Sequence, residues 1–317
     1  MSCPAFLSQH SLWTSLVIGG LANGFLYALI AIGYTLVYGV LRLINFAHSE
    51  VFMMGSFGTF FVMRGALGST SPGGTEGLIY LLLAVAAGAL FGGLVGFALE
   101  RVAYRPLRRR DAPRLAYLIT AIGASFFLQQ LAAKEFGRNA SGFFIPEPAM
   151  VSGNAFSLCG APVQSFSIVI VIVSVVMLVL TDTIVRKTKL GRGIRAVAQD
   201  AEVASLMGVN IDRTISTTFI LGGALGGVAG ALWGMQFQTS YLMGFDPGLK
   251  AFSAAVLGGI GNLRGAMLGG ILIGLVESVS LIWFSAAYED VVSFVVLVGV
   301  LMFRPTGLLG ERLGRVA

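Results

Sequence analysis

Residues 12–41, LWTSLVIGGLANGFLYALIAIGYTLVYGVL, contain no charged side chain, and this stretch decides the fold class. An α-helix needs about 20 apolar residues to cross the hydrocarbon core of a bilayer. The rest of the chain has the same character, because 56% of its 317 residues are hydrophobic and 11% are charged. A soluble domain carries about 25% charged residues. The sequence therefore predicts an integral membrane protein.

Further apolar segments follow along the whole chain. We expect one all-α transmembrane domain over residues 1–317, a polytopic helix bundle of about eight or nine membrane segments that includes broken helices. Segment 248–263 has only a short uncharged run, so we expect a broken or partial helix there. The predicted segments are 12–41, 46–64, 78–99, 115–133, 163–183, 214–238, 248–263, 265–285 and 289–303.

The positive charges are unevenly placed, and they predict the orientation of the chain. Fifteen of the 21 Lys and Arg residues fall within 101–114, 186–213 and 304–315. Clusters of this kind mark cytoplasmic loops. With all three clusters inside, the N-terminus lies outside and the C-terminus lies in the cytoplasm. The clusters flank apolar spans and contain one aromatic residue among them, Tyr104, so nucleic acid is not the expected partner.

Glycine recurs at every fourth position in three of the apolar segments. Small residues at this spacing let helix backbones approach one another closely. We therefore expect these glycines to make compact helix packing rather than to line a pore. The three ladders are Gly88, Gly92 and Gly96; Gly222, Gly226, Gly230 and Gly234; and Gly261, Gly265 and Gly269.

The chain lacks the motifs of catalysis. It contains no G-x-x-x-x-G-K-[ST] phosphate loop and no H-E-x-x-H zinc motif. The two cysteines, Cys3 and Cys159, lack the spacing of a metal site, and the sequence leaves open whether they form a disulfide. We therefore expect no catalytic site, no metal and no cofactor in this chain.

The basic loop 186–213 contains a predicted amphipathic helix over residues 194–207. Its apolar residues recur at three- and four-residue steps, and Gly208 is typical of a helix C-terminus. Its polar face carries Asp200 and Glu202, which anionic lipid repels, so a protein partner is favoured over a lipid surface. We predict that this loop couples a partner to the spans through Asp200, Ala204, Leu206 and Gly208.

Four stretches, taken together, resemble the permease subunits of ATP-driven importers for branched-chain amino acids. They are NGFLYALIAIGYTLVYGVLRLINFAHSEVFMMGSF (23–57), GRGIRAVAQDAEVASLMGVN (191–210), GLKAFSAAVLGGIGNLRGAMLGGILIGLVES (248–278) and LMFRPTGLLG (301–310). The resemblance covers nearly the whole chain. One departure is Ser49, where the family usually has glycine.

The resemblance implies a membrane permease in the cytoplasmic (inner) membrane, with no ATP hydrolysis of its own. It implies three kinds of partner besides the lipid bilayer: a second related permease, two ATP-binding cassette ATPases, and an external binding protein that delivers the substrate. The expected substrate class is branched-chain, aliphatic amino acids.

The stretch RLINFAHSE, residues 42–50, places polar side chains between two apolar segments. Ionisable groups within a membrane segment are candidates for function. Two interpretations remain open: a discontinuity that lines the substrate pathway, or a polar turn at the cytoplasmic edge. Under the first, we predict that Glu277 is the distant partner of Arg42 or His48. The candidate pathway residues are Arg42, Asn45, His48, Glu50 and Glu277.

Other functions stay open at this stage. A related permease for urea, short amides or other amino acids is the nearest alternative. An ion-coupled secondary carrier, with His48 and Glu277 as a proton relay, is an alternative from another class, but such a carrier does not require the amphipathic loop helix. A binding protein and ATPases encoded beside the chain would distinguish the importer.

Overall fold

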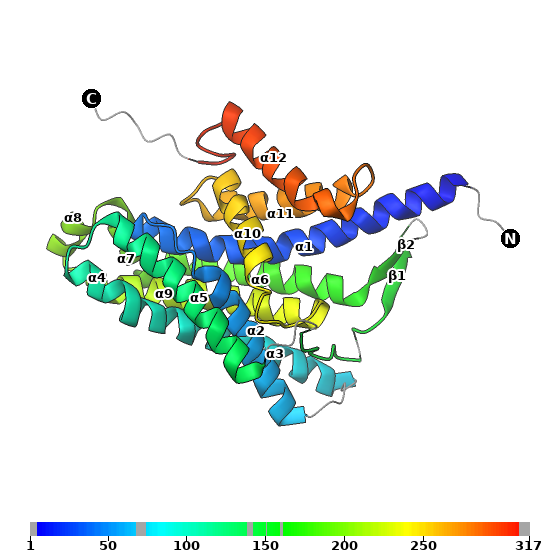
Figure 1. Cartoon of the computed structure of the whole chain (residues 1–317), viewed down its shortest axis with the longest axis horizontal. Coiled ribbons are helices and arrows are strands. Elements are labelled where there is room, and N and C mark those ends of the chain that lie inside the picture. The colour runs from blue at the N-terminus through cyan, green and yellow to red at the C-terminus, as the bar shows by residue number, and fades with distance from the viewer. Residues whose placement is uncertain (1–4, 68–73, 138–141, 150, 159–160, 311–317) are drawn as a thin grey trace.

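The computed structural model describes residues 5–67, 74–137, 142–149, 151–158 and 161–310, which form a helix bundle with one small β-hairpin (Figure 1). Cys3 and Cys159 lie outside the described residues, so the question of their pairing stays open. The helices are α1 (Ala5–Leu41), α2 (His48–Leu67), α3 (Gly74–Leu99), α4 (Arg105–Arg109), α5 (Arg114–Phe136), α6 (Ser165–Lys187), α7 (Lys189–Gln199), α8 (Ala201–Leu206), α9 (Ile211–Gln236), α10 (Phe245–Gly258), α11 (Leu263–Ser280) and α12 (Glu289–Phe303). A π-helical turn, Glu100–Tyr104, joins α3 to α4, a 3-10 turn, Ala286–Tyr288, precedes α12, and the antiparallel strands are β1 (Asn154–Leu158) and β2 (Ala161–Gln164).

The polytopic helix bundle is confirmed. Within the described residues, seven helical stretches are long and apolar enough to cross a membrane. The other two predicted segments correspond to α2, which carries charges at both ends, and to α10, which has only 14 residues. Helix α10 is thus the short segment that the sequence predicts. The hairpin β1–β2 is the exception to the all-α expectation.

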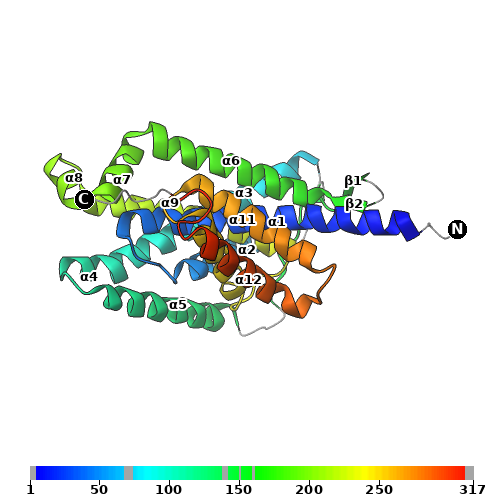
Figure 2. The ribbon, with the colours of Figure 1, turned by 90° about the horizontal axis from the view of Figure 1, so that it is seen from above.

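Helices α1 and α9 form the centre of the bundle. In their most apolar stretches, 61% of α1 and 72% of α9 are buried, against 6% for α12. Figure 2 shows α5 and α6 on opposite flanks of α1. Helices α2, α3 and α11 pack directly against the central pair. The other helices therefore cover most of the surface of these two helices.

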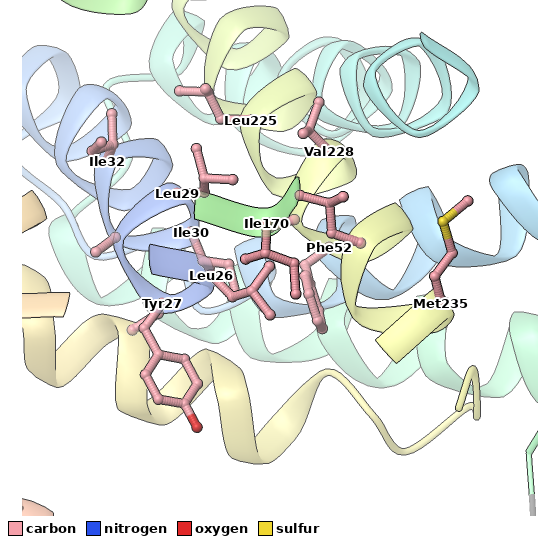
Figure 3. Close-up of a cluster of buried hydrophobic side chains, with 14 of the residues drawn as sticks. Leu26, Tyr27, Leu29, Ile30, Ile32, Phe52, Ile170, Leu225, Val228 and Met235 are labelled. Carbon is pink, nitrogen blue, oxygen red and sulfur yellow. The ribbon is translucent and has the colours of Figure 1, made fainter. Parts of the chain in front are cut away.

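The hydrophobic core lies where α1, α2, α6 and α9 meet. Leu26 and Ile30 of α1, Phe52 of α2 and Val228 of α9 are fully buried. Ile170 of α6 joins them, and Figure 3 shows Leu26, Ile170 and Phe52 side by side. This cluster fixes the start of α2 relative to α1 and α9.

Helix α9 approaches its neighbours through glycines on two faces. Gly227 lies against Gly88 and Gly92 of α3, and a Cβ atom on Gly227 would overlap the carbonyl of Gly88. On another face, a Cβ atom on Gly230 would overlap the carbonyl of Phe52 in α2. The expectation that these ladders serve helix packing is confirmed at these positions, because backbone lies directly on backbone.

The bundle has two chemically different ends. Helices α4, α7 and α8, with the basic residues of 101–114 and 186–213, lie at one end, on the left of Figure 1. We call this the basic end. The hairpin and the start of α1 lie at the opposite, hairpin end, and α12 runs in the same direction as α1 in both views. The arrangement fits the expected orientation, which stays a prediction.

Replacing Gly227 with alanine is expected to destabilise the protein. The added methyl group has no space against Gly88, so α3 and α9 must separate, at a cost of about 1–3 kcal/mol. Thermal unfolding of the purified protein in detergent measures the effect as a lower midpoint. The matched control is Gly123→Ala on α5, where a Cβ atom meets nothing within 4 Å. Equal midpoints for both variants and wild type would contradict the importance of the close contact.

Candidate functional site

The turn between α1 and α2 is joined to the loop helix α7 by Arg42. Arg42 has a positive φ of 51°, and its N–H donates to the carbonyl of Tyr38 at 2.7 Å, which ends α1. Its Nη2 donates to the carbonyls of Ala198 (3.0 Å) and Gln199 (2.9 Å), the last turn of α7. Carbonyls at a helix C-terminus lack partners within the helix and attract cations. Arg42 therefore ties α7 to the beginning of α2.

Asn45 holds the same turn from the side of α3. Its Oδ1 accepts hydrogen bonds from the N–H of Ala47 at 3.1 Å and from the hydroxyl of Tyr104 at 2.7 Å. Tyr104 ends the π-helical turn that follows α3. Both side chains are buried. The amide of Asn45 thus fixes the backbone just before α2.

His48, the first residue of α2, fills a notch between α1 and α9. The side chain is 2% exposed, and its ring meets Tyr34 edge-on with centroids 4.8 Å apart. A Cβ atom on Gly33 would overlap the ring, and one on Gly226 would lie 3.5 Å from Nε2. Nε2 has no hydrogen-bond partner among the described residues. The notch depends on glycine in both neighbouring helices.

Glu50 points to the other side of α2, because residues two apart on a helix differ by about 200°. It is 2% exposed; Oε1 accepts a hydrogen bond from Ser125 of α5 at 3.3 Å, and Oε2 has no partner among the described residues. A Cβ atom on Gly244, at the start of α10, would lie 2.8 Å from Oε2. Next to it, Gly248 of α10 lies against the side chain of Ser49. A buried carboxylate with one hydrogen bond therefore lies where the short helix begins.

Glu277 belongs to a separate cluster toward the hairpin end. Its Oε1 is paired with Nζ of Lys250 in α10 and accepts a hydrogen bond from the hydroxyl of Tyr27 at 3.2 Å. The same Nζ lies 2.9 Å from Oδ1 of Asp290 at the start of α12. One lysine thus holds the short helix α10 against α11 and α12.

The predicted pairing of Glu277 with Arg42 or His48 is wrong. The fold brings Lys250 to the carboxylate instead, while Arg42 reaches α7 and His48 reaches α9. Lys250 was missing from the sequence-based candidates, although it is a charged residue within an apolar stretch. A charge within the membrane requires a partner. The position of Lys250 in an apolar stretch was therefore a sequence signal for an ion pair.

The loop helix predicted over 194–207 is in fact two helices. Asp200 ends α7, and its Oδ1 accepts hydrogen bonds from the N–H groups of Glu202 (2.9 Å) and Val203 (3.0 Å) at the start of α8. Aspartate is a favoured N-cap because its oxygen satisfies these free donors. Asp200 therefore shapes the loop.

Helix α8 exposes an apolar surface at the basic end. Leu206 and Met207 are 86% and 81% exposed, and Val203 is also exposed. Helix α8 ends at Leu206, and Gly208 follows Met207 with a positive φ of 84°. Ala204 is buried and anchors α8. An exposed apolar tip of this kind is a candidate docking surface.

A network of ion pairs, absent from the sequence-based candidates, joins α3 to α9 at the basic end. Glu100 is fully buried and accepts hydrogen bonds from Arg108 (3.0 Å) and Ser216 (2.6 Å). Asp212, at the start of α9, lies 2.6 Å from both Arg105 and Arg108. Removing one partner of a buried ion pair costs about 3–5 kcal/mol. The network therefore holds the end of α3 and the start of α9 together.

These features define a class of protein. The bundle of apolar helices contains a short helix with a buried carboxylate at its start, and it presents an apolar loop surface that is joined to the helix carrying that carboxylate. This is the architecture of a polytopic membrane protein.

Residues 16–301 match the family described as the permease component of branched-chain amino acid transport systems, and the chain belongs to this family. The high-affinity branched-chain amino acid transport system permease protein LivH of Salmonella typhimurium is 41% identical over 303 residues, which cover 93% of this chain and 94% of LivH. BraD of Pseudomonas aeruginosa is 41% identical over 301 residues, covering 93% and 95%. The probable LivH of Methanocaldococcus jannaschii is 26% identical over 310 residues, covering 92% and 91%. The chain is a multi-pass protein of the cytoplasmic membrane.

Arg42→Ala is expected to loosen α7 without unfolding the bundle. The variant leaves the carbonyls of Ala198 and Gln199 without their donor, so amide hydrogen exchange should rise over residues 189–206. Mass spectrometry of exchanged peptides measures the rise. The control is Arg192→Ala, which removes an exposed arginine of α7 itself. A similar rise in both variants, or none in either, would show that Arg42 does not hold α7.

Proposed function

We propose that the chain is the membrane-spanning permease subunit of an ATP-driven importer for branched-chain amino acids. Its family membership and the names of its relatives support this proposal. The sequence contains no phosphate loop, so partner subunits hydrolyse ATP. The proposed partners are two ATP-binding cassette ATPases, a second related permease and an external substrate-binding protein.

The proposed orientation places the basic end in the cytoplasm. Positively charged loops are retained on the cytoplasmic side, and the two largest basic clusters lie together at this end. The hairpin end then faces outward, toward the binding protein. The surface of α8 faces the compartment that contains ATP.

The observation that carries the proposal is the link from α8 to α2. Helix α8 follows α7 directly at Asp200, and Arg42 is bonded to the last turn of α7. Arg42 lies in the turn that begins the helix carrying Glu50. A partner that displaces the α7–α8 loop therefore also pulls on the start of α2. This is how ATP hydrolysis in a partner moves the pathway.

Glu50 is the proposed pathway residue of this chain. An amino acid carries an ammonium group, and the free Oε2 of Glu50 can accept a hydrogen bond from it. Substrate sites in transporters typically form at discontinuous helices. Asn45 and His48, by contrast, are engaged by Tyr104 and by the notch between α1 and α9, so we assign them to shaping the turn.

Two alternatives are less well supported by the geometry. Urea and short amides lack the ammonium group that a buried carboxylate favours. An ion-coupled carrier with a proton relay from His48 to Glu277 requires these groups to communicate. Glu277 is instead paired with Lys250, and His48 lies against glycines of α1 and α9. The importer is therefore the favoured function.

Leu206→Asp is expected to abolish binding of the ATPase subunits while the bundle stays folded. The substitution puts a charge in the centre of the proposed apolar docking surface, where it has no partner. Co-purification of the ATPases with the tagged permease measures binding. The control is Phe156→Asp on β1, an exposed apolar residue at the opposite end. Normal co-purification and uptake by the Leu206 variant would refute the proposed docking surface.

Glu50→Gln is expected to lower amino-acid uptake per ATP hydrolysed by about tenfold, a loss typical of one charged contact. The amide keeps the shape of the side chain but removes its charge. Vesicles containing the whole importer report both rates. Glu135→Gln, an exposed carboxylate of α5, is the control. The same uptake per ATP in wild type and both variants would remove Glu50 from the pathway and leave it as packing.

A further inference from the structure

A hollow lined by arginines lies at the basic end, between the end of α3 and the start of α9. Its volume is about 700 Å³, and Arg101, Arg213 and Thr217 contribute to its lining. A second hollow of about 320 Å³ shares Arg101 with the first and adds Arg109. Neither hollow touches the turn or the short helix of the proposed pathway. The arginines thus face a space that is separate from the proposed substrate pathway.

Two of these arginines are not engaged by protein. Arg105, which also lines the hollow, is bonded to Asp212. Arg101 and Arg213 make no side-chain hydrogen bond or ion pair with any residue that the structure describes. A guanidinium group presents several donors in a plane and binds phosphate oxygens in pairs. The hollow therefore offers two free guanidinium groups to an anion.

The hollow also has an apolar side. Phe97 of α3 and Ile220 of α9 line it, and both are 37% exposed. The uncharged part of α3 ends at Leu99, just before Arg101. The apolar residues therefore lie toward the hydrocarbon, and the arginines lie at the depth of the lipid headgroups. A soluble anion does not need this apolar side, whereas a phospholipid fits both parts.

We propose that this hollow binds an anionic phospholipid, with its phosphate at Arg101 and Arg213 and its acyl chains along Phe97 and Ile220. Basic hollows at the cytoplasmic ends of membrane helices suit such headgroups. Ser205 of α8 lines the same hollow, so the bound lipid lies beside the loop that carries the docking surface. The bound lipid thereby stabilises the contact between the α7–α8 loop and α9. This inference rests on the proposed orientation, in which the basic end lies at the cytoplasmic face of the membrane.

The test uses the full-length protein, purified in mild detergent with its partner subunits, and two probes with identical acyl chains, phosphatidylglycerol and phosphatidylcholine. Native mass spectrometry measures retained lipid across a titration. We expect tighter binding of phosphatidylglycerol, and a loss of about tenfold in the double variant Arg101→Ala/Arg213→Ala. The control is Lys187→Ala/Arg192→Ala, which removes the same charge from exposed positions of α6 and α7. Its binding should stay within about twofold of wild type.

Three results would overturn the proposal. Equal binding of both lipids, or an equal loss in the control variant, would show that the arginines act only as general surface charge. Displacement of the lipid by soluble glycerophosphoglycerol at the same concentration would identify a site for a free phosphate compound. Cross-linking of cysteines placed at 101 and 213 to a partner subunit, with no lipid retained, would identify a protein interface. Phe97→Ser adds an independent arm, because only a lipid site should lose affinity when the apolar side is made polar.

Discussion

The rest of the structure depends on the direct contact of backbones along α9. Gly227 meets α3 and Gly230 meets α2, while Gly226 leaves space for the ring of His48. These contacts set the position of α2 to within the width of a methyl group. The side chains at the start of α2 are positioned by the same contacts. Glu50 is therefore held beside the start of α10 by glycines of α9 that it does not itself touch. A single side chain added to α9 would move the helix that carries the carboxylate.

The positions of the spans could be predicted from the sequence, because the length of an uncharged apolar run decides whether a helix can cross a membrane. All nine predicted segments correspond to helices, and the short α10 was expected from its brief apolar run. The break in the loop was missed, since the apolar spacing continues across Asp200. Aspartate is nevertheless a favoured residue at the start of a helix, and Asp200 caps the start of α8 in the structure.

The candidate site was predictable only in part. The stretch 42–50 was recognised as polar within an apolar surrounding, and Glu50 in this stretch is buried. The partner of Arg42 could not be found from sequence, because it is a pair of backbone carbonyls, and every residue has one. Glu277 and Lys250 are distant in the chain, so their pairing needed the path of α10. Side-chain identity shows which groups need partners, whereas topology selects the partners.

Lys250 also has a consequence for the order in which the protein is made. Its charge is neutralised by Glu277 of α11 and Asp290 of α12, and both follow it in the chain. Until α11 and α12 are in place, the ammonium group on this 14-residue helix has no counter-ion, and placing it in hydrocarbon is costly. The stable position of α10 therefore depends on two helices that are synthesised after it. The surroundings of Glu50, which include the start of α10, depend in turn on these later parts of the chain.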